Sequence, residues 1–169
     1  EGVFCISTSY REEKNPIPGR HELIFPMFEF ESKGGMKELV ELEERLLTYL
    51  GFENSTEVKY EDVCEEYGGV EILENEHENK MHIEIGPNIS LQHFPLRTNP
   101  FWNMKLNEDK VHSNKINVII HGIETIGSAE RSTNKEEMRE KFKTILNGEY
   151  AKILYDKFTK ERVDSELDT

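Results

Sequence analysis

Two residues near the start of the chain have the types and spacing needed to bind a nucleotide. Arg11 and Glu13 lie two positions apart, so on a β-strand their side chains would point to the same face. The planar guanidinium of Arg11 suits a phosphate, and the carboxylate of Glu13 can accept a hydrogen bond from an amino group such as that of adenine. The competing interpretation is a surface ion pair, which contributes little to stability.

A second group of such residues follows a short loop, 15–19, which contains two prolines and a glycine. Arg20 and His21 are placed to close over a polyphosphate, although polar loops often contain such residues. Phe25 begins the next apolar segment, where its ring could stack on a purine or, as phenylalanines more often do, join a core. These residues therefore allow a nucleotide site and leave a structural role open.

Two carboxylates continue the alternating segment 23–32, in which Glu29 and Glu31 share one face with Phe25 and Met27. Two carboxylates on one face of a strand either take part in a polar site or are exposed to water. The pattern alone does not separate these two cases.

Near the end of the chain, the segment 122–131 combines small residues with charged ones. Its glycines allow the backbone to approach a ligand closely. Glu124 is a candidate Mg²⁺ ligand, because proteins usually hold this ion by one or two carboxylates together with substrate phosphates. Arg131 could pair with a substrate carboxylate. The alternative is a strand and turn with an ordinary ion pair.

The elements that must position these residues follow from periodicity and turn residues. Strands are expected over 3–9, 23–32, 81–85, 89–94 and 116–121, with a turn at 86–88. Helices are expected over 36–50, 60–67, from a capping pattern at 133–136 to Gly148, and over 150–167. The nearly continuous apolar run 116–121 is typical of a strand covered on both faces. The order predicts an α+β fold, a mostly antiparallel sheet flanked by helices on one face.

Composition narrows the class of protein. A chain of 169 residues with 36% hydrophobic and 33% charged residues suits one globular domain. No apolar run approaches a membrane span, so no membrane association is expected. The net charge of −13 argues against indiscriminate binding to nucleic acid or anionic lipid. Cys5 and Cys64 are too few for a disulfide framework or a zinc site, which favours a reducing, cytoplasmic compartment.

Taken together, the motifs resemble the catalytic domain of class II aminoacyl-tRNA synthetases, in the aspartate/asparagine branch. The resemblance is carried by Tyr10-Arg11-Glu12-Glu13, by Arg20-His21-Glu22-Leu23-Ile24-Phe25 with Glu29-Phe30-Glu31, by Tyr60-Glu61-Asp62, by Phe94-Pro95 with Pro100-Phe101, and by Gly122-Ile123-Glu124 with Arg131. It implies one partial catalytic domain over 1–169 that lacks the family's motif one and motif three. The chain has no start methionine, so we expect a piece of a longer protein.

The resemblance implies ATP as a substrate and assigns five residues to it. Arg11 would bind the α-phosphate and stabilise the charge that develops at phosphorus. Glu13 would contact the adenine end, and Phe25 would stack on adenine. Arg20 and His21 would reach the outer phosphates.

For the amino acid and the metal, the resemblance implies four residues. Glu124 would hold Mg²⁺ between phosphates, and is therefore expected to be catalytic together with the α-phosphate arginine. Arg131 would bind the side chain of aspartate or asparagine, and Glu29 or Glu31 would meet the substrate ammonium. One departure from the family pattern is Asn117, where many relatives have a second metal-binding Asp, which leaves the number of metal ions open.

Three functions follow from this resemblance. The first is activation of aspartate for asparagine synthesis with ammonia, as in asparagine synthetase A-like relatives. The alternative is an aspartyl- or asparaginyl-tRNA ligase, and a third possibility is a non-catalytic paralogue with a regulatory binding role, favoured by Ile24 and Asn117. The resemblance also implies a homodimer for the complete protein.

Overall fold

The computed structural model describes residues 2–167, and the chain divides into two compact units, Glu1–Gly35 and Met36–Thr169. Each unit has its own sheet. The units are described separately below. The prediction of one partial catalytic domain over 1–169 is not tested by this division.

The first unit is a hairpin of two antiparallel strands, β1 (Gly2–Tyr10) and β2 (Ile24–Ser32). Its register runs without interruption from Gly2 opposite Ser32 to Tyr10 opposite Ile24. These bounds confirm the strands expected over 3–9 and 23–32. The long connection between them contains the predicted loop 15–19.

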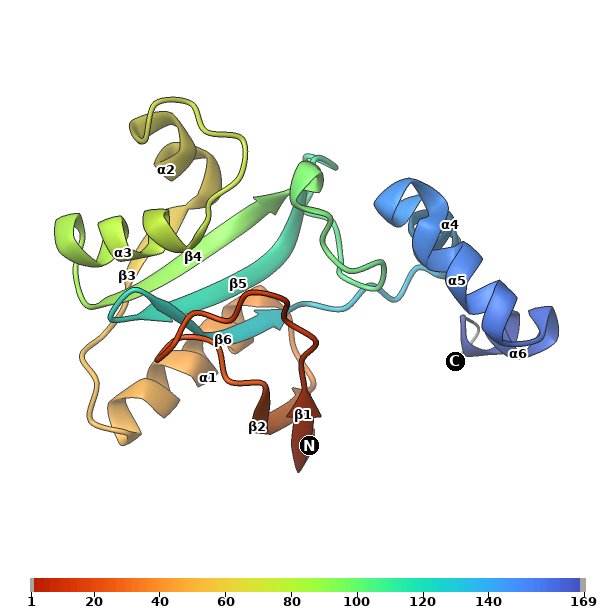
Figure 1. Ribbon diagram of the computed structural model, residues 1–169, viewed down its shortest axis with the longest axis horizontal. Coiled ribbons are helices and arrows are strands. Elements are labelled where there is room, and N and C mark those ends of the chain that lie inside the picture. Colours follow the sequence, from red (N-terminus) through yellow and green to blue (C-terminus); the bar gives the residue numbers. More distant parts are fainter. Residues whose placement is uncertain (1, 168–169) are drawn as a thin grey trace. The chain divides into compact units, whose positions relative to one another are not determined.

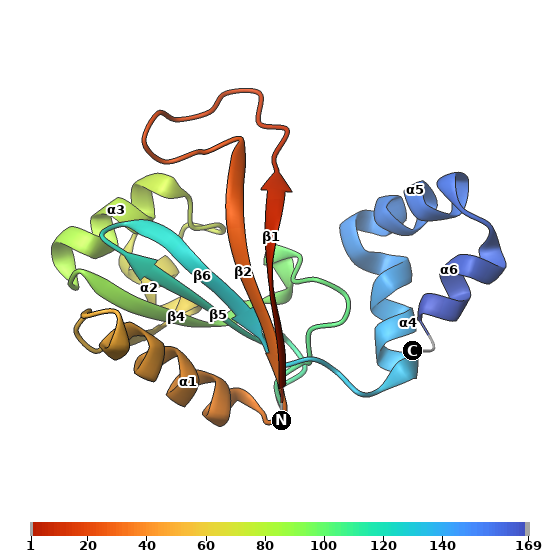
Figure 2. The ribbon, with the colours of Figure 1, turned by 90° about the horizontal axis from the view of Figure 1, so that it is seen from below.

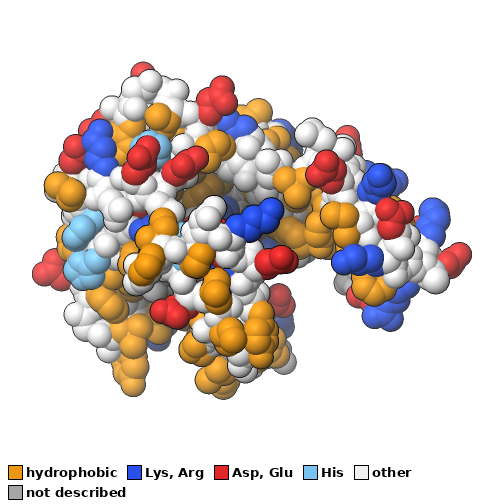
Figure 3. Space-filling model, viewed as in Figure 1, with side chains coloured by type: hydrophobic (Ala, Val, Ile, Leu, Met, Phe, Trp, Pro, Cys, Tyr) orange, Lys and Arg blue, Asp and Glu red, His pale blue; other side chains and the backbone are white. Residues whose placement is uncertain are grey.

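One face of this hairpin is apolar and exposed. Phe4, Ile6, Tyr10, Ile24 and Phe28 are each more than half exposed, and apolar side chains gather over β1 and β2 in Figure 3. The rings of Phe4 and Phe28 pack against each other, with centroids 5.8 Å apart. Two strands cannot enclose a core of their own.

The second unit contains a four-stranded sheet in the order β3-β4-β5-β6. Its strands are β3 (Thr56–Lys59), β4 (Asn88–Pro95), β5 (His112–Ile120) and β6 (Ile123–Ala129). Only the β3–β4 pair is parallel; the other two pairs are antiparallel. The predicted α+β class with a mostly antiparallel sheet is confirmed. The sequence analysis missed β3, because four residues are too few for alternation to stand out.

Helices cover both faces of this sheet, not one as predicted (Figures 1 and 2). Helix α1 (Met36–Tyr49) packs on one face, where the buried residues are Leu47, Ile116 and Val118. Helices α2 (Tyr60–Glu66) and α3 (Asn75–Glu84) pack on the other, where the buried residues include Val63, Met81, Ile89, Leu91 and Ile119. The apolar run 116–121 therefore lies in a strand that is covered on both faces, as its composition predicted.

The segment 81–85 is helical, so the strand predicted there is wrong. Met81, Ile83 and Ile85 alternate with polar residues, which imitates a strand. In the structure they belong to the end of α3, and Ile83 is 81% exposed. The helix is started by a local contact, in which the Glu74 backbone N–H donates to Nδ1 of His77 at 2.8 Å. Residues 86–88 consequently join a helix to β4 rather than two strands.

The last described elements are helices α4 (Lys135–Thr144), α5 (Glu149–Lys157) and α6 (Lys160–Glu166). Short 3₁₀ turns lie at Leu96–Thr98, after β4, and at Ile145–Gly148, between α4 and α5. The single helix predicted over 150–167 is interrupted. Phe158 is extended, and the Thr159 side chain accepts a hydrogen bond from the Arg162 N–H, which starts a new helix. No helix within residues 2–167 is long and apolar enough to cross a membrane.

Candidate functional site

Arg11 and Phe25 lie on the same face of the hairpin and contact each other. Phe25 is directly opposite Ser9 in the strand register, and Arg11, which directly follows the last residue of β1, lies two positions beyond Ser9 on that face. The Arg11 backbone N–H donates to the Leu23 carbonyl at 2.9 Å, which extends the strand pairing by one step. The guanidinium carbon lies 5.5 Å from the Phe25 ring centroid, within cation–π range. A positive charge and an aromatic ring are thus presented side by side.

Glu13 lies in the loop beyond β1, so the strand geometry used to pair it with Arg11 does not extend that far. Its carboxylate accepts a hydrogen bond of 3.4 Å from the Asn15 backbone N–H. Glu13 therefore shapes the start of the loop, and its role toward adenine stays a prediction.

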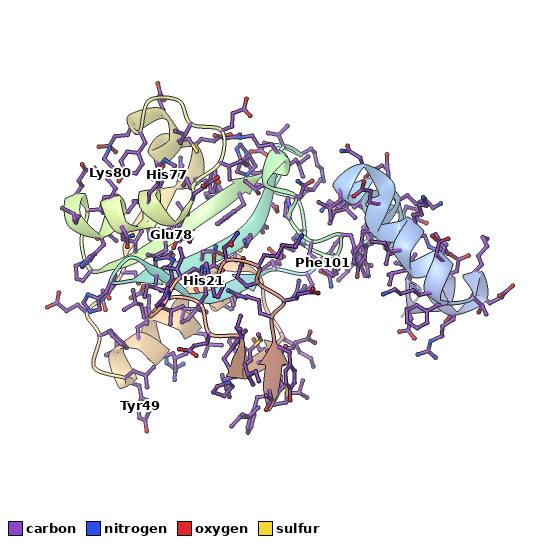
Figure 4. The ribbon with its side chains drawn as sticks, in the orientation of Figure 1. His21, Tyr49, His77, Glu78, Lys80 and Phe101 are labelled. Atoms are coloured by element: carbon purple, nitrogen blue, oxygen red, sulfur yellow. The ribbon has the colours of Figure 1, made fainter. Side chains whose placement is uncertain are left out.

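His21 organises the far side of the same loop (Figure 4). Its Nδ1 accepts a hydrogen bond of 3.2 Å from the Ile17 backbone N–H, and the N–H groups of Arg20 and His21 both donate to the Ile17 carbonyl. Because Nδ1 is an acceptor, the ring proton of the neutral imidazole lies on Nε2. This nitrogen is then available as a donor for an anionic ligand.

Glu29 and Glu31 continue the polar face that begins with Arg11 and Phe25. Glu29 lies opposite Cys5, and its carboxylate accepts a hydrogen bond of 2.8 Å from the Ser7 hydroxyl. Four strand positions separate it from Phe25, a rise of about 13 Å. The face therefore places a cation and an aromatic ring at one end and carboxylates at the other, which suits an elongated ligand with an anionic and a cationic part.

Glu124 and Asn117 form a compact group of oxygen atoms on the sheet of the second unit. The Asn117 amide donates to Oε2 of Glu124 at 2.5 Å. Its Oδ1 is buried and has no hydrogen-bond partner among the described residues. A Cβ atom built on Gly127 would lie 3.2 Å from Oε1 of Glu124 and 3.8 Å from Oδ1 of Asn117. The glycine leaves open the space in front of both oxygens.

This group fits a divalent cation that is only partly coordinated by protein. An orphaned carbonyl oxygen and a carboxylate are the ligand types that Mg²⁺ prefers. The described residues contain no cluster of three or more His, Cys, Asp or Glu that could hold a metal ion. The remaining ligands would have to come from phosphate and water, as is usual for Mg²⁺ bound with a nucleotide.

Arg131 follows β6 and is oriented by the loop that precedes β5. Its guanidinium donates to Oδ1 of Asn103 at 2.8 Å, and its backbone pairs with Met104. The neighbouring Phe101 packs edge-to-face on Tyr150 of α5. The direction of Arg131 thus depends on how this loop packs against the C-terminal helices.

The structure gathers the predicted residues in three places. Arg11, Phe25, Glu29 and Glu31 share one face of the hairpin; Glu13, Arg20 and His21 lie in its loop; Glu124 and Arg131 belong to the second unit. Sequence reasoning had noted Asn117 only as a departure from the family pattern. Its orphaned oxygen is visible only in the tertiary structure.

Glu43 is a further polar residue that sequence reasoning missed. It is 3% exposed on α1 and accepts a hydrogen bond from the Ser128 hydroxyl of β6. Its burial could have been inferred from its position in the apolar stripe of the helix, one turn before Leu47. Burial raises the pKa of Glu43, and the Ser128 hydrogen bond offsets part of that rise.

Glu43→Gln is expected to stabilise the protein at neutral pH by about 1 kcal/mol, the scale of a buried polar group. Because the folded-state pKa exceeds the ordinary value of 4.5, the native free energy of unfolding falls as pH rises from 4.5 through the folded pKa. Denaturant unfolding across this range should show the mutant's advantage growing with pH. Glu41→Gln, at an exposed position of the same helix, serves as the control; an equal gain there would contradict the prediction.

The sequence matches the family model described as tRNA synthetases class II (D, K and N) over residues 1–163. No curated protein matches it. Solved structures with the same fold include the asparaginyl-tRNA synthetase from Pyrococcus horikoshii complexed with asparaginyl-adenylate (TM-score 0.74, 15% identity, covering 84% of this chain and 40% of that one).

Two proteins from Entamoeba histolytica are similarly related. The asparaginyl-tRNA synthetase in complex with asparaginyl-adenylate has a TM-score of 0.73 and 20% identity, with 85% of this chain and 41% of that one covered. The aspartyl-tRNA synthetase has a TM-score of 0.69 and 19% identity, with 83% of this chain and 37% of that one covered. At these identities the likeness shows the fold, and the chain spans about two fifths of the length of these structures.

Proposed function

Because the chain belongs to the class II tRNA synthetases of the D, K and N group, we propose that it forms part of the catalytic core of an ATP-dependent ligase. The proposed reaction activates aspartate or asparagine as an aminoacyl-adenylate and transfers it to tRNA. The activity is assigned to the complete protein, since the chain spans only part of its relatives' length.

The observation that carries this proposal is the contact of Arg11 with Phe25 on one face of the hairpin. In the proposed reaction, adenine stacks on the Phe25 ring and the α-phosphate lies against the guanidinium. A carboxylate oxygen of the amino acid forms a bond to the α-phosphorus while the bond to the leaving pyrophosphate breaks. Arg11 stabilises the negative charge that increases on the phosphoryl oxygens, so no protein nucleophile is required.

The other residues bind and orient. Nε2 of His21 donates to an outer phosphate, and Glu29 meets the substrate ammonium on the same face as Arg11. Arg131 binds the side-chain carboxylate or amide of the amino acid. Glu124 and Asn117 would hold Mg²⁺, which supplies neutralisation of phosphate charge when it is bound.

The tRNA acceptor is favoured over ammonia by the family match and by neighbours named as aspartyl- and asparaginyl-tRNA synthetases. One observation favours the ammonia-dependent synthesis of asparagine from aspartate. It is the net charge of −13. An acidic surface does not attract tRNA, although segments outside this sequence contribute to the surface of the complete protein.

The deciding experiment is ATP–pyrophosphate exchange by the complete protein, with aspartate and asparagine supplied separately. Exchange that depends on one of them supports adenylate formation. Labelled amino acid should then appear on tRNA. Formation of free asparagine from aspartate and ammonia would instead identify an ammonia ligase. An absence of exchange with either amino acid would favour the non-catalytic paralogue with a regulatory role.

A further inference from the structure

A lysine lies on the same sheet face as the oxygen group described above. In the β5–β6 register, Lys115 is opposite Ala129 and Asn117 is opposite Gly127. Residues two apart on a strand point to the same side, so Lys115 and Asn117 share a face. The glycine and the alanine opposite them keep this part of the face uncovered by larger side chains of β6.

The ammonium of Lys115 is held in a partly buried place. Its Nζ lies 4.1 Å from the centre of the Phe94 ring, a close cation–π contact. Burial lowers the pKa of Lys115, and the charges of Glu124 and Glu78 oppose that shift, so both carboxylates are near enough to act on the ammonium. Within residues 2–167, Lys115 forms no ion pair of 4.0 Å or less.

Glu78 reaches this place from α3. Its Oε2 accepts a hydrogen bond of 3.3 Å from the Glu124 backbone N–H. The helix and the β5–β6 turn are therefore joined next to the oxygen group, which fixes the carboxylates relative to the sheet. The Lys115 ammonium on the Phe94 ring therefore lies close enough to the oxygens of Asn117 and Glu124 to influence their electrostatics.

We propose that Lys115 is a built-in cation of the metal-binding face, which weakens the binding of a divalent ion by Asn117 and Glu124 until nucleotide phosphates are present. This inference rests on the proposed function, because it concerns the order in which metal and ATP reach that site. Lys115 is a positioning residue here: it acts on the metal through the field at Glu124.

The charges of the group explain this order of binding. Asn117 is neutral, so Glu124 and Glu78 supply two negative charges near the orphaned oxygen, and the ammonium of Lys115 offsets one of them. A free divalent cation is then attracted by one net negative charge instead of two, and it meets a fixed positive charge in a place of reduced dielectric. A triphosphate brings several negative charges, which outweigh that repulsion and supply the missing oxygen ligands.

The test is Mn²⁺ binding to the complete protein, measured by electron paramagnetic resonance of free Mn²⁺ at neutral pH. Without nucleotide, Lys115→Gln is expected to bind Mn²⁺ about tenfold more tightly than the unmodified protein, from the loss of one nearby charge. Lys115→Arg keeps the charge and should retain weak binding. Lys37→Gln, which removes an exposed lysine of α1, is the control and should leave the affinity unchanged.

Equal Mn²⁺ affinity for the unmodified protein and Lys115→Gln would overturn the inference, as would an equal gain in Lys37→Gln. Circular dichroism establishes that each variant is folded, and Lys115→Met replaces Lys115→Gln if the latter is not. The measurement involves no turnover. A protein that shows the Mn²⁺ effect but no ATP–pyrophosphate exchange refutes the proposed function alone, whereas exchange without the Mn²⁺ effect refutes this inference alone.

Discussion

Arg11→Ala is expected to reduce amino-acid-dependent ATP–pyrophosphate exchange of the complete protein by about 10²–10³-fold, or about 3–4 kcal/mol of barrier. This is the cost of removing one group that stabilises developing charge at a reaction centre. Arg11 is exposed and lies at the end of a strand, so its loss should leave the free energy of unfolding nearly unchanged. The measurement is the exchange rate at saturating ATP and amino acid.

Two variants separate the guanidinium's role from its charge. Lys14→Ala removes an equal charge from an exposed position of the same loop and should retain the exchange rate. Arg11→Lys keeps the charge but lacks the planar fork that matches phosphate, so it should recover only part of the loss. A decrease of tenfold or less in Arg11→Ala would argue against direct contact with the α-phosphate.

Phe142→Ala is expected to destabilise the second unit by about 3–5 kcal/mol, the usual cost of truncating a buried phenylalanine. Phe142 is 1% exposed, and its ring contacts Trp102, Tyr150 and Tyr155 at centroid distances of 5.8, 5.8 and 5.9 Å. These contacts join α4 and α5 to the loop before β5. Denaturant unfolding measures the loss, and Phe158→Ala, at a position 55% exposed, should cost far less.

The same change should act on the proposed amino-acid site. Trp102 is adjacent to Asn103, whose side chain accepts a hydrogen bond from the Arg131 guanidinium. Loosening of the aromatic cluster should therefore let Arg131 move, and the KM for the amino acid should rise while the KM for ATP changes little. An equal rise in both values would indicate general unfolding rather than loss of Arg131 orientation.

Local pattern sufficed for the elements whose signals do not depend on the rest of the chain. Strands β1, β2 and β4 follow from alternation or apolar composition between turn residues. Helix α1 follows from apolar spacing and ends two residues before Gly51, whose φ of +88° is the left-handed conformation that glycine adopts readily. The shared face of Phe25 and Glu29 was predictable for the same reason, whereas the contact of Phe25 with Arg11 depends on the register between β1 and β2.

Pattern failed where two structures suit the same sequence. Met81, Ile83 and Ile85 fit a strand by alternation, but only Met81 is fully buried, and the contact of Glu74 with His77 starts a helix. Phe158 continues a helical spacing, but Thr159 offers a cap that starts a new helix. In both cases a hydrogen bond near a helix start, which periodicity does not reveal, decided the outcome.

The sequence by itself determined the residue types of the site, the order of its motifs and the shared face of Phe25 and Glu29, because strand geometry converts spacing within one strand into direction. The register of β1 against β2 decided that Arg11 lies on that face as well. Only the tertiary structure decided which groups are desolvated. The orphaned oxygen of Asn117 and the ammonium of Lys115 owe their surroundings to neighbours on other strands and helices. Burial is a property of the packed chain, and the energies of buried charges depend on it.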